Sequence, residues 1–170
     1  MTISADKIPA QSQDRQPGLE SEMNPQPQYN RESYRGSDKL KGKVALITGG
    51  DSGIGRSVAV LYAKEGADVA IVYLDEHQDA QKTKESVEAE GQKCLLLPGD
   101  ISNEQFCHET VQKTVEQLGK LDILVNNAGM QYMENPETLE DIDSGRLGSI
   151  FSTNIFSMFY LCKAAIPHLK

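Results

Sequence analysis

The chain has 170 residues, about the length of one domain. Its 25 acidic and 17 basic side chains give a formal net charge of -8. No basic run with interleaved aromatic residues occurs, which argues against nucleic-acid binding. No apolar run approaches the ~20 residues that span a bilayer, and the amino terminus lacks the basic start and apolar middle of a signal peptide. We therefore expect a cytoplasmic protein with no membrane or nucleic-acid partner.

The cysteine and histidine residues show no spacing typical of a metal site or a disulfide framework. We expect buried, reduced thiols and no structural metal. The residues concerned are Cys94, Cys107 and Cys162, and His77, His108 and His168.

Residues 1–38 differ in composition from the rest of the chain. Prolines are interspersed with glutamines, and apolar residues are sparse and without a period. Such a segment is a tail that is disordered, or one that lies in extended form along a folded surface. Tyr29 and Tyr34 would anchor it in the second case, whereas composition alone favours disorder. The folded domain is expected to cover residues 39–170.

Residues 43–55, KVALITGGDSGIG, combine a strand, a glycine-rich turn and the start of a helix. The first part is apolar without strict alternation, as in a parallel strand covered on both faces. A helical apolar period begins at Ile54. Glycine lets the backbone turn sharply and approach a ligand, and the free N–H groups at a helix start favour a diphosphate. In this context the glycines predict nucleotide binding.

Strands and helices alternate after this motif, joined by short connections. The predicted strands cover residues 69–73, 94–97 and 121–125, and the predicted helices cover about 76–90 and 102–118. Ser102 and Gln105 form the expected capping box of the second of these helices. Alternation of this kind means right-handed crossovers and a parallel sheet with helices on both faces. We therefore predict an α/β, Rossmann-type doubly wound fold, with the order 3-2-1-4 for the strands present.

A long helix is predicted over residues 144–166, with Asp143 as its N-cap. Asn154 lies within the apolar stripe of this helix, and a buried amide must find hydrogen-bond partners. It either fastens the helix to the neighbouring strand or holds a functional water, and spacing alone favours the fastener. The stripe comprises Leu147, Ile150, Phe151, Ile155, Met158, Phe159 and Cys162.

Four motifs follow one another along residues 43–170: Thr48-Gly49-x-x-x-Gly53-Ile54-Gly55, then Asp100, then Asn126-Asn127-Ala128-Gly129, and then Asn154. In this order they resemble the amino-terminal part of the short-chain dehydrogenase/reductase family. The tail rich in proline and glutamine resembles the extension of a bacterial branch that includes stress-associated proteins and aldehyde reductases. The resemblance implies a homo-oligomeric, NAD(P)(H)-dependent oxidoreductase that interconverts a carbonyl and an alcohol on a small substrate.

The resemblance also implies a role for each motif. Asp100 would meet the adenine, and Asn154 would hold a proton-relay water. From the residues alone, Asp100 would equally cap backbone N–H groups of a loop, and Asn127 would equally satisfy backbone groups of a turn. The implied cofactor-binding residues are Thr48, Gly49, Ser52, Gly53, Ile54, Gly55, Asp100, Ile101, Asn127, Ala128 and Gly129.

The choice between NAD and NADP depends on the end of the second strand. An acid about 20 residues past the glycines usually receives the ribose hydroxyls and disfavours a 2′-phosphate, but Asp75 and Glu76 come slightly late for this role. Arg56 would lie near a 2′-phosphate, or it is a solvated helix arginine. On this basis the sequence favours NADP.

One part of the family pattern does not occur in these 170 residues. Family members continue into a strand that bears a serine and a helix that bears Tyr-x-x-x-Lys, and no tyrosine here has a lysine four positions later. We therefore expect a fragment that lacks the carboxyl-terminal half of the domain and is inactive alone, with the apolar face of its last helix partly uncovered. The alternative functions are a non-catalytic dinucleotide-binding module and an inert fold fragment. Substrate contacts are expected only from Met130, Gln131 and Tyr132.

Overall fold

The computed structural model describes residues 11, 13, 18–31, 33–131 and 138–169. Four parallel strands form one sheet in the order β3-β2-β1-β4, which confirms the predicted topology. The strands are β1 (Val44–Thr48), β2 (Asp68–Tyr73), β3 (Cys94–Pro98) and β4 (Ile123–Val125). The predicted substrate neighbour Tyr132 lies outside the described residues.

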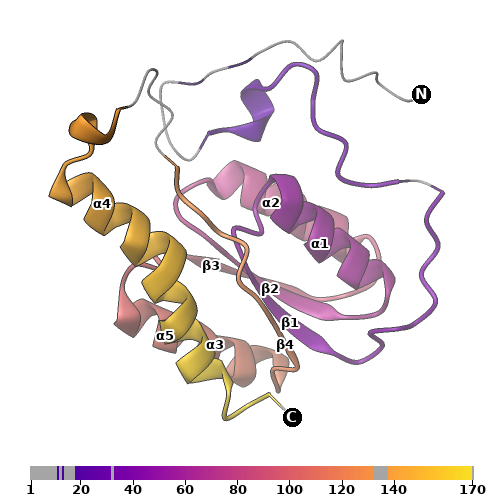
Figure 1. The fold of residues 1–170 in the computed structure, drawn as a ribbon. Helices are drawn as coiled ribbons and strands as arrows, with labels where there is room; N and C mark the ends of the chain where they lie inside the picture. The colour runs from indigo at the N-terminus through magenta and orange to yellow at the C-terminus, as the bar shows by residue number, and fades with distance from the viewer. Residues whose placement is uncertain (1–10, 12, 14–17, 32, 132–137, 170) are drawn as a thin grey trace.

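Helices cover the two faces of this sheet (Figure 1). The helices α1 (Gly53–Lys64) and α2 (His77–Glu88) pack on one face, and α3 (Glu104–Leu118) and α5 (Ser157–Ala165) pack on the other. Alternate residues of β1 divide between the two cores: Ala45 and Ile47 face α1, whereas Leu46 joins the core beneath α3 and α5. Burial on both faces explains why the strands are apolar at consecutive positions.

The start of α3 differs from the sequence prediction. Asn103 is the N-cap, and its Oδ1 accepts a hydrogen bond from the Phe106 amide at 3.1 Å. The Ser102 hydroxyl donates instead to Asp100 at 2.8 Å, so the predicted capping box is wrong. Asn and Ser are about equally strong N-caps, and the Asp100 carboxylate engages the serine.

The last predicted helix is continuous but irregular. It consists of α4 (Ser144–Phe151), a π-helical turn η4 (Ser152–Phe156) and α5, and the Asp143 side chain caps its start as predicted. The extra residue in the π-turn shifts the helical phase between α4 and α5. Small residues of α5, with Leu161, face α3, while much of the predicted apolar stripe is exposed on both sides of the π-turn. The large exposed apolar residues of this segment are Leu147, Phe151, Ile155, Phe156, Phe159 and Ile166.

None of the helices in the described ranges is long and apolar enough to cross a membrane.

Residues of the amino-terminal segment contact the folded domain. Tyr34 donates a hydrogen bond to the buried carboxylate of Glu65, which follows α1. The amides of Ser37 and Lys39 donate to the same carboxylate at 2.9 and 3.0 Å, and the Lys39 ammonium group lies 3.0 Å from it. These donors, the Tyr34 hydroxyl first, hold the pKa of Glu65 well below its usual range. Glu65 thus fixes the point where the segment enters β1.

The Glu65 contacts predict a pH-dependent loss of stability in the variant Glu65→Gln. Because the carboxylate pKa is lower in the folded chain than in the unfolded chain, its ionisation stabilises the fold above pH about 4.5. Glu65→Gln should lower the urea midpoint at pH 7, and the difference from wild type should shrink as the pH falls below 4.5. Glu22→Gln, at an exposed position, is the control. A difference that is constant with pH would contradict this assignment.

The packing of α5 on α3 predicts different effects for two of its large apolar residues. Leu161 is fully buried, whereas Phe159 is 70% exposed. Leu161→Ala should lower the free energy of unfolding by about 2–5 kcal/mol because it leaves a cavity. Phe159→Ala should change it by no more than about 0.5 kcal/mol in the monomeric chain. Urea unfolding followed by circular dichroism measures both, and equal losses would contradict the packing described here.

Candidate functional site

The glycine-rich turn between β1 and α1 has a backbone that only glycine fits. Gly49 and Gly53 have φ values of 62° and 50°. A Cβ on Gly55 would lie 1.8 Å from the Gly49 carbonyl oxygen, and one on Gly50 would lie 2.6 Å from the Ile71 side chain. The turn therefore packs closely on itself and on β2, and it brings the start of α1 to the carboxyl edge of the sheet.

A cavity of about 440 Å³ lies at this edge. It is bounded by the glycine-rich turn, the end of β2, the loop after β3 and the segment after β4. The structure thus brings most of the predicted site residues together around one cavity, at the place where open parallel sheets bind ligands. The predicted residues that line it are Gly49, Ser52, Gly53, Ile54, Gly55, Asp100, Ile101, Asn127, Ala128 and Gly129.

Thr48 lies behind the cavity and joins β1 to the segment after β4. Its Oγ1 accepts hydrogen bonds from the amides of Asn127 and Ala128, each at 3.0 Å. The Asn127 side chain donates in return to the carbonyls of Thr48 and Gly49, at 2.9 and 3.1 Å. These bonds fix the Asn127 backbone beside the glycine-rich turn, so Thr48 acts on the cavity through Asn127.

Asn154 lies in the π-turn and is not among the residues that line the cavity. Its Oδ1 accepts from the Met130 amide at 2.7 Å, and its Nδ2 donates to the Met130 carbonyl at 2.8 Å. The side chain thus fastens the last helix to the segment after β4, which is the interpretation that its spacing favoured. Its role with a proton-relay water remains a prediction.

Asp100 combines both of the interpretations left open by the sequence. It lines the cavity, and its carboxylate also accepts from the Ser102 amide and hydroxyl, each at 2.8 Å. These bonds hold the loop after β3 in place, so any ligand contact by Asp100 would be made by a carboxylate with a fixed orientation.

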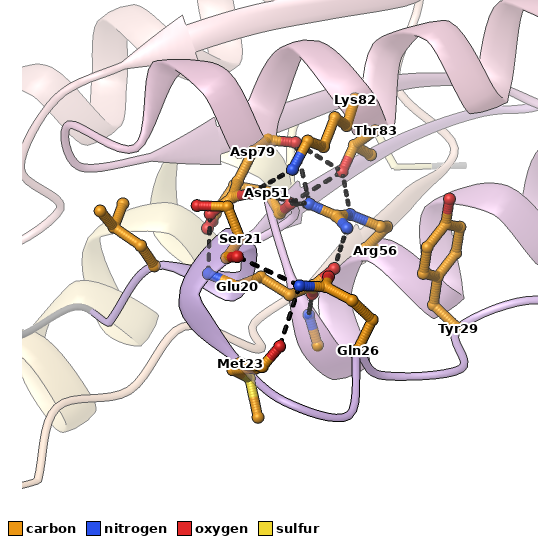
Figure 2. A network of polar contacts seen from close by, with 12 residues as sticks. Glu20, Ser21, Met23, Gln26, Tyr29, Asp51, Arg56, Asp79, Lys82 and Thr83 are labelled. Carbon is orange, nitrogen blue, oxygen red and sulfur yellow. Dashed lines mark hydrogen bonds and ion pairs between the residues drawn. The ribbon is translucent and has the colours of Figure 1, made fainter. Parts of the chain in front are cut away.

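The structure shows that both expectations for Arg56 were wrong. The residue is only 1% exposed, so it is not a solvated arginine, and it does not line the cavity. Its guanidinium group donates to the Asp51 carbonyl and to Thr83, and it pairs with Glu20 and Asp79 (Figure 2). The argument for a 2′-phosphate contact therefore fails. Sequence periodicity could not reveal the burial of Arg56, because the residues that pair with it come from distant parts of the chain.

An acidic wall of the cavity was also missed. Three residues with ionisable side chains, Asp51, Tyr73 and Glu76, line the cavity, and all three are nearly inaccessible to solvent. Burial is the main cause that raises the pKa of each group, to about 7 for Glu76. The signal in the sequence was the Asp75-Glu76 pair after the second strand, which comes slightly late for a contact with the ribose. Glu76 in fact reaches the cavity.

The described residues contain no cluster of three or more histidine, cysteine, aspartate or glutamate side chains that would hold a metal ion. Burial raises the pKa of the Cys94 thiol to about 12 and that of Cys107 to about 11. Both thiols are therefore protonated at neutral pH.

Comparison with known proteins agrees with this geometry. A family model described as short chain dehydrogenase matches residues 43–170. The chain belongs to the short-chain dehydrogenase/reductase family. Its recognition from four motifs is therefore confirmed, including the branch of stress proteins and aldehyde reductases.

Two curated relatives and one solved structure are typical of the matches. General stress protein 39 of Bacillus subtilis (strain 168) is 64% identical over 164 residues, which are 96% of this chain and 57% of that protein. NADPH-dependent aldehyde reductase 1, chloroplastic, of Arabidopsis thaliana is 44% identical over 94% of this chain and 57% of its own length. The crystal structure of a short chain dehydrogenase from Burkholderia cenocepacia J2315 in complex with NADP has a TM-score of 0.73 and 35% identity, and the match covers 76% of this chain and 52% of that one. The chain thus spans a little over half the length of these curated relatives.

The close packing of the turn predicts a marked difference between two glycine substitutions. Gly55→Ala would place a Cβ against the Gly49 carbonyl and should lower the free energy of unfolding by about 1–3 kcal/mol, or more if the backbone cannot move. Gly148→Ala, in α4, is the control, because a Cβ at Gly148 meets no atom within 4 Å. This variant should stabilise α4 by up to about 1 kcal/mol. Urea unfolding of both variants tests this, and a neutral Gly55→Ala would contradict the described turn.

Proposed function

We propose that the protein is an NAD(P)(H)-dependent oxidoreductase that interconverts a carbonyl and an alcohol on a small substrate. The observation that carries the proposal is the glycine-rich turn at the start of α1, which opens on a cavity at the carboxyl edge of the sheet. The turn fits a dinucleotide because its glycines let the backbone pack tightly on itself, so that the start of α1 opens on the cavity. The bound nicotinamide would supply the hydride.

The chain's own residues would bind and orient the dinucleotide. We propose that the amides of Ile54 and Gly55 and the hydroxyl of Ser52 hold the diphosphate, aided by the dipole of α1. Asp100 and Ile101 would contact the adenine, and the backbone after β4 would border the rest of the dinucleotide. The hydrogen bonds of Thr48, Asn127 and Asn154 would keep that backbone in place.

The substrate and its proton chemistry are proposals for the whole protein. The name of the Arabidopsis relative, an aldehyde reductase, supports a small aldehyde as the carbonyl substrate. A Tyr-x-x-x-Lys pair does not occur in the 170 residues, so the second candidate for this chain is dinucleotide binding without turnover. The exposed stripe of Leu147, Phe151 and Phe159 supports a homo-oligomer of the full-length protein.

We propose that NADP and NAD both bind, and that the charge of Glu76 sets their ratio. The names of the relative and of the solved structure favour NADP. The cavity lining favours the unphosphorylated ribose, because it includes Asp51 and Glu76 and, among the described residues, neither lysine nor arginine. The pKa of Glu76, which is about 7, reconciles the names of the relatives with the acidic lining, because the Glu76 carboxyl group repels a 2′-phosphate only when it is ionised.

Two measurements test the proposed function. Isothermal titration of the 170-residue chain with NADPH and NADH should give saturable binding of each. The complete gene product should oxidise NADPH or NADH in the presence of a small aldehyde, whereas the 170-residue chain should not. A folded chain that binds neither dinucleotide would contradict the proposal, and aldehyde reduction by the 170-residue chain would show that a Tyr-x-x-x-Lys pair is dispensable.

The position of Glu76 predicts a pH-dependent cofactor ratio. As the pH rises from 6 to 8, Glu76 ionises and NADP binding should weaken relative to NAD binding by roughly fivefold or more, because two charges about 4 Å apart repel by about 1 kcal/mol in water and by more where one of them is shielded, as Glu76 is. Glu76→Gln should bind NADP more tightly at pH 8 and should show a flatter ratio, because only the ionisation of the phosphate itself then remains. Dissociation constants of wild type and Glu76→Gln for both dinucleotides at pH 6, 7 and 8 give the ratio for each protein. A ratio with the same pH dependence in both proteins would exclude Glu76 as its cause.

A further inference from the structure

Residues 18–31, here called the amino-terminal strap, run across α1 and α2 (Figure 1) and insert one acidic side chain behind the glycine-rich turn. We propose that this strap is part of the dinucleotide site, and that Glu20 is a positioning residue that holds the turn in its diphosphate-binding shape. The inference rests on the proposed function, because it assigns a task to the strap only if the turn binds a dinucleotide.

Glu20 contacts both the backbone of the turn and its supporting arginine (Figure 2). One carboxylate oxygen accepts from the Gly53 amide at 3.0 Å, and the other accepts from the Arg56 guanidinium group. The Glu20 backbone amide donates to the Asp79 carboxylate at 3.0 Å. Glu20 is only 5% exposed, so the bonds with Arg56 and Asp79 are shielded from water, the bond with Gly53 is partly shielded, and all three depend on the strap being in place.

Arg56 holds the other side of the turn. Its Nε and Nη2 donate to the Asp51 carbonyl at 3.0 and 2.6 Å, and the Thr83 hydroxyl donates to the same oxygen at 2.9 Å. The side chain of Asp51 lines the cavity. One ion pair therefore fixes the turn at positions 51 and 53, on either side of Ser52.

The charges of this cluster balance only when Glu20 is present. Glu20 and Asp79 carry negative charge, and Arg56 and the partly exposed Lys82 carry positive charge, with Asp79 at 3.6 Å from Arg56 and 3.5 Å from Lys82. Removing one partner of a buried pair leaves an unpaired charge, which is strongly unfavourable. The ring of Tyr29, whose centroid lies 5.0 Å from the Arg56 guanidinium carbon, covers the pair through a cation–π contact.

Glu20 also replaces a cap that the helix lacks. Ser52 is the N-cap of α1, but its side chain makes no capping hydrogen bond. Glu20 takes the first amide of the helix, at Gly53, and leaves the amides of Ile54 and Gly55 for a diphosphate. Because Glu20 does not itself line the cavity, its carboxylate would support the turn without occupying the place of the ligand.

The test compares ligands with and without a diphosphate in the complete gene product. Glu20→Ala should weaken the binding of ADP-ribose roughly tenfold or more, the effect of losing one charged hydrogen bond, and should leave the binding of adenosine unchanged. Glu20→Asp should restore part of the loss. Glu22→Ala, at an exposed position of the same short 3-10 turn (Glu20–Glu22), is the matched control and should bind both ligands as wild type does. Equal or tighter binding of ADP-ribose by Glu20→Ala, or equal weakening of both ligands, would overturn the proposal.

A second pair of variants covers the case in which Glu20→Ala does not fold. Tyr29→Ala uncovers the Arg56 pair, whereas Tyr34→Ala removes the contact with Glu65 at the far end of α1. Tyr29→Ala should weaken ADP-ribose binding severalfold more than Tyr34→Ala does, and equal effects would overturn the proposal. Failure of the wild-type protein to bind ADP-ribose would instead contradict the proposed function, and the inference with it.

Discussion

The start of α1 is the point on which the site depends. Its first amides can meet a ligand only because glycine stands, in the preceding turn and in the first turn of α1, where a Cβ would overlap neighbouring atoms. The turn packs closely on itself and on β2, but its glycines have no side chains that could hold this shape with contacts of their own. The structure supplies them from outside: Thr48 and Asn127 fasten the turn to β4, and Arg56 fastens it to α2 and to the amino-terminal strap.

Ionisable groups surround the turn in two different ways. Behind it, the buried side chains of Glu20, Asp79 and Arg56, together with the partly exposed Lys82, form a charge-balanced cluster. In front of it, Asp51 and Glu76 face the cavity, and burial favours their neutral forms. The rear cluster is suited to hold a fixed backbone shape. The front wall is suited to discriminate between ligands by charge, because burial raises the pKa of Glu76 to about 7.

Local patterns predicted most of the fold and the cavity lining. Buried parallel strands and the glycine-rich turn have signals within ten or so residues, and the alternation of strands and helices fixed the topology. The burial of Arg56 had no such signal, because its partner Glu20 lies 36 positions away, in a segment whose composition favoured disorder. Asn154 was correctly noticed in the sequence, whereas Glu76 was set aside as slightly late, because its place in the cavity depends on how the chain runs from β2 into α2. The phase shift caused by the π-turn likewise could not be predicted from a regular helical period.

The most direct test of the central claim is an amide chemical-shift titration of the ¹⁵N-labelled chain with ADP-ribose. A diphosphate bound at the start of α1 should shift the amide resonances of Ile54 and Gly55 most strongly, and those of the loop around Asp100 to a smaller extent. Saturable binding that leaves the Ile54 and Gly55 resonances unchanged would contradict the account, because the ligand would then lie elsewhere on the protein.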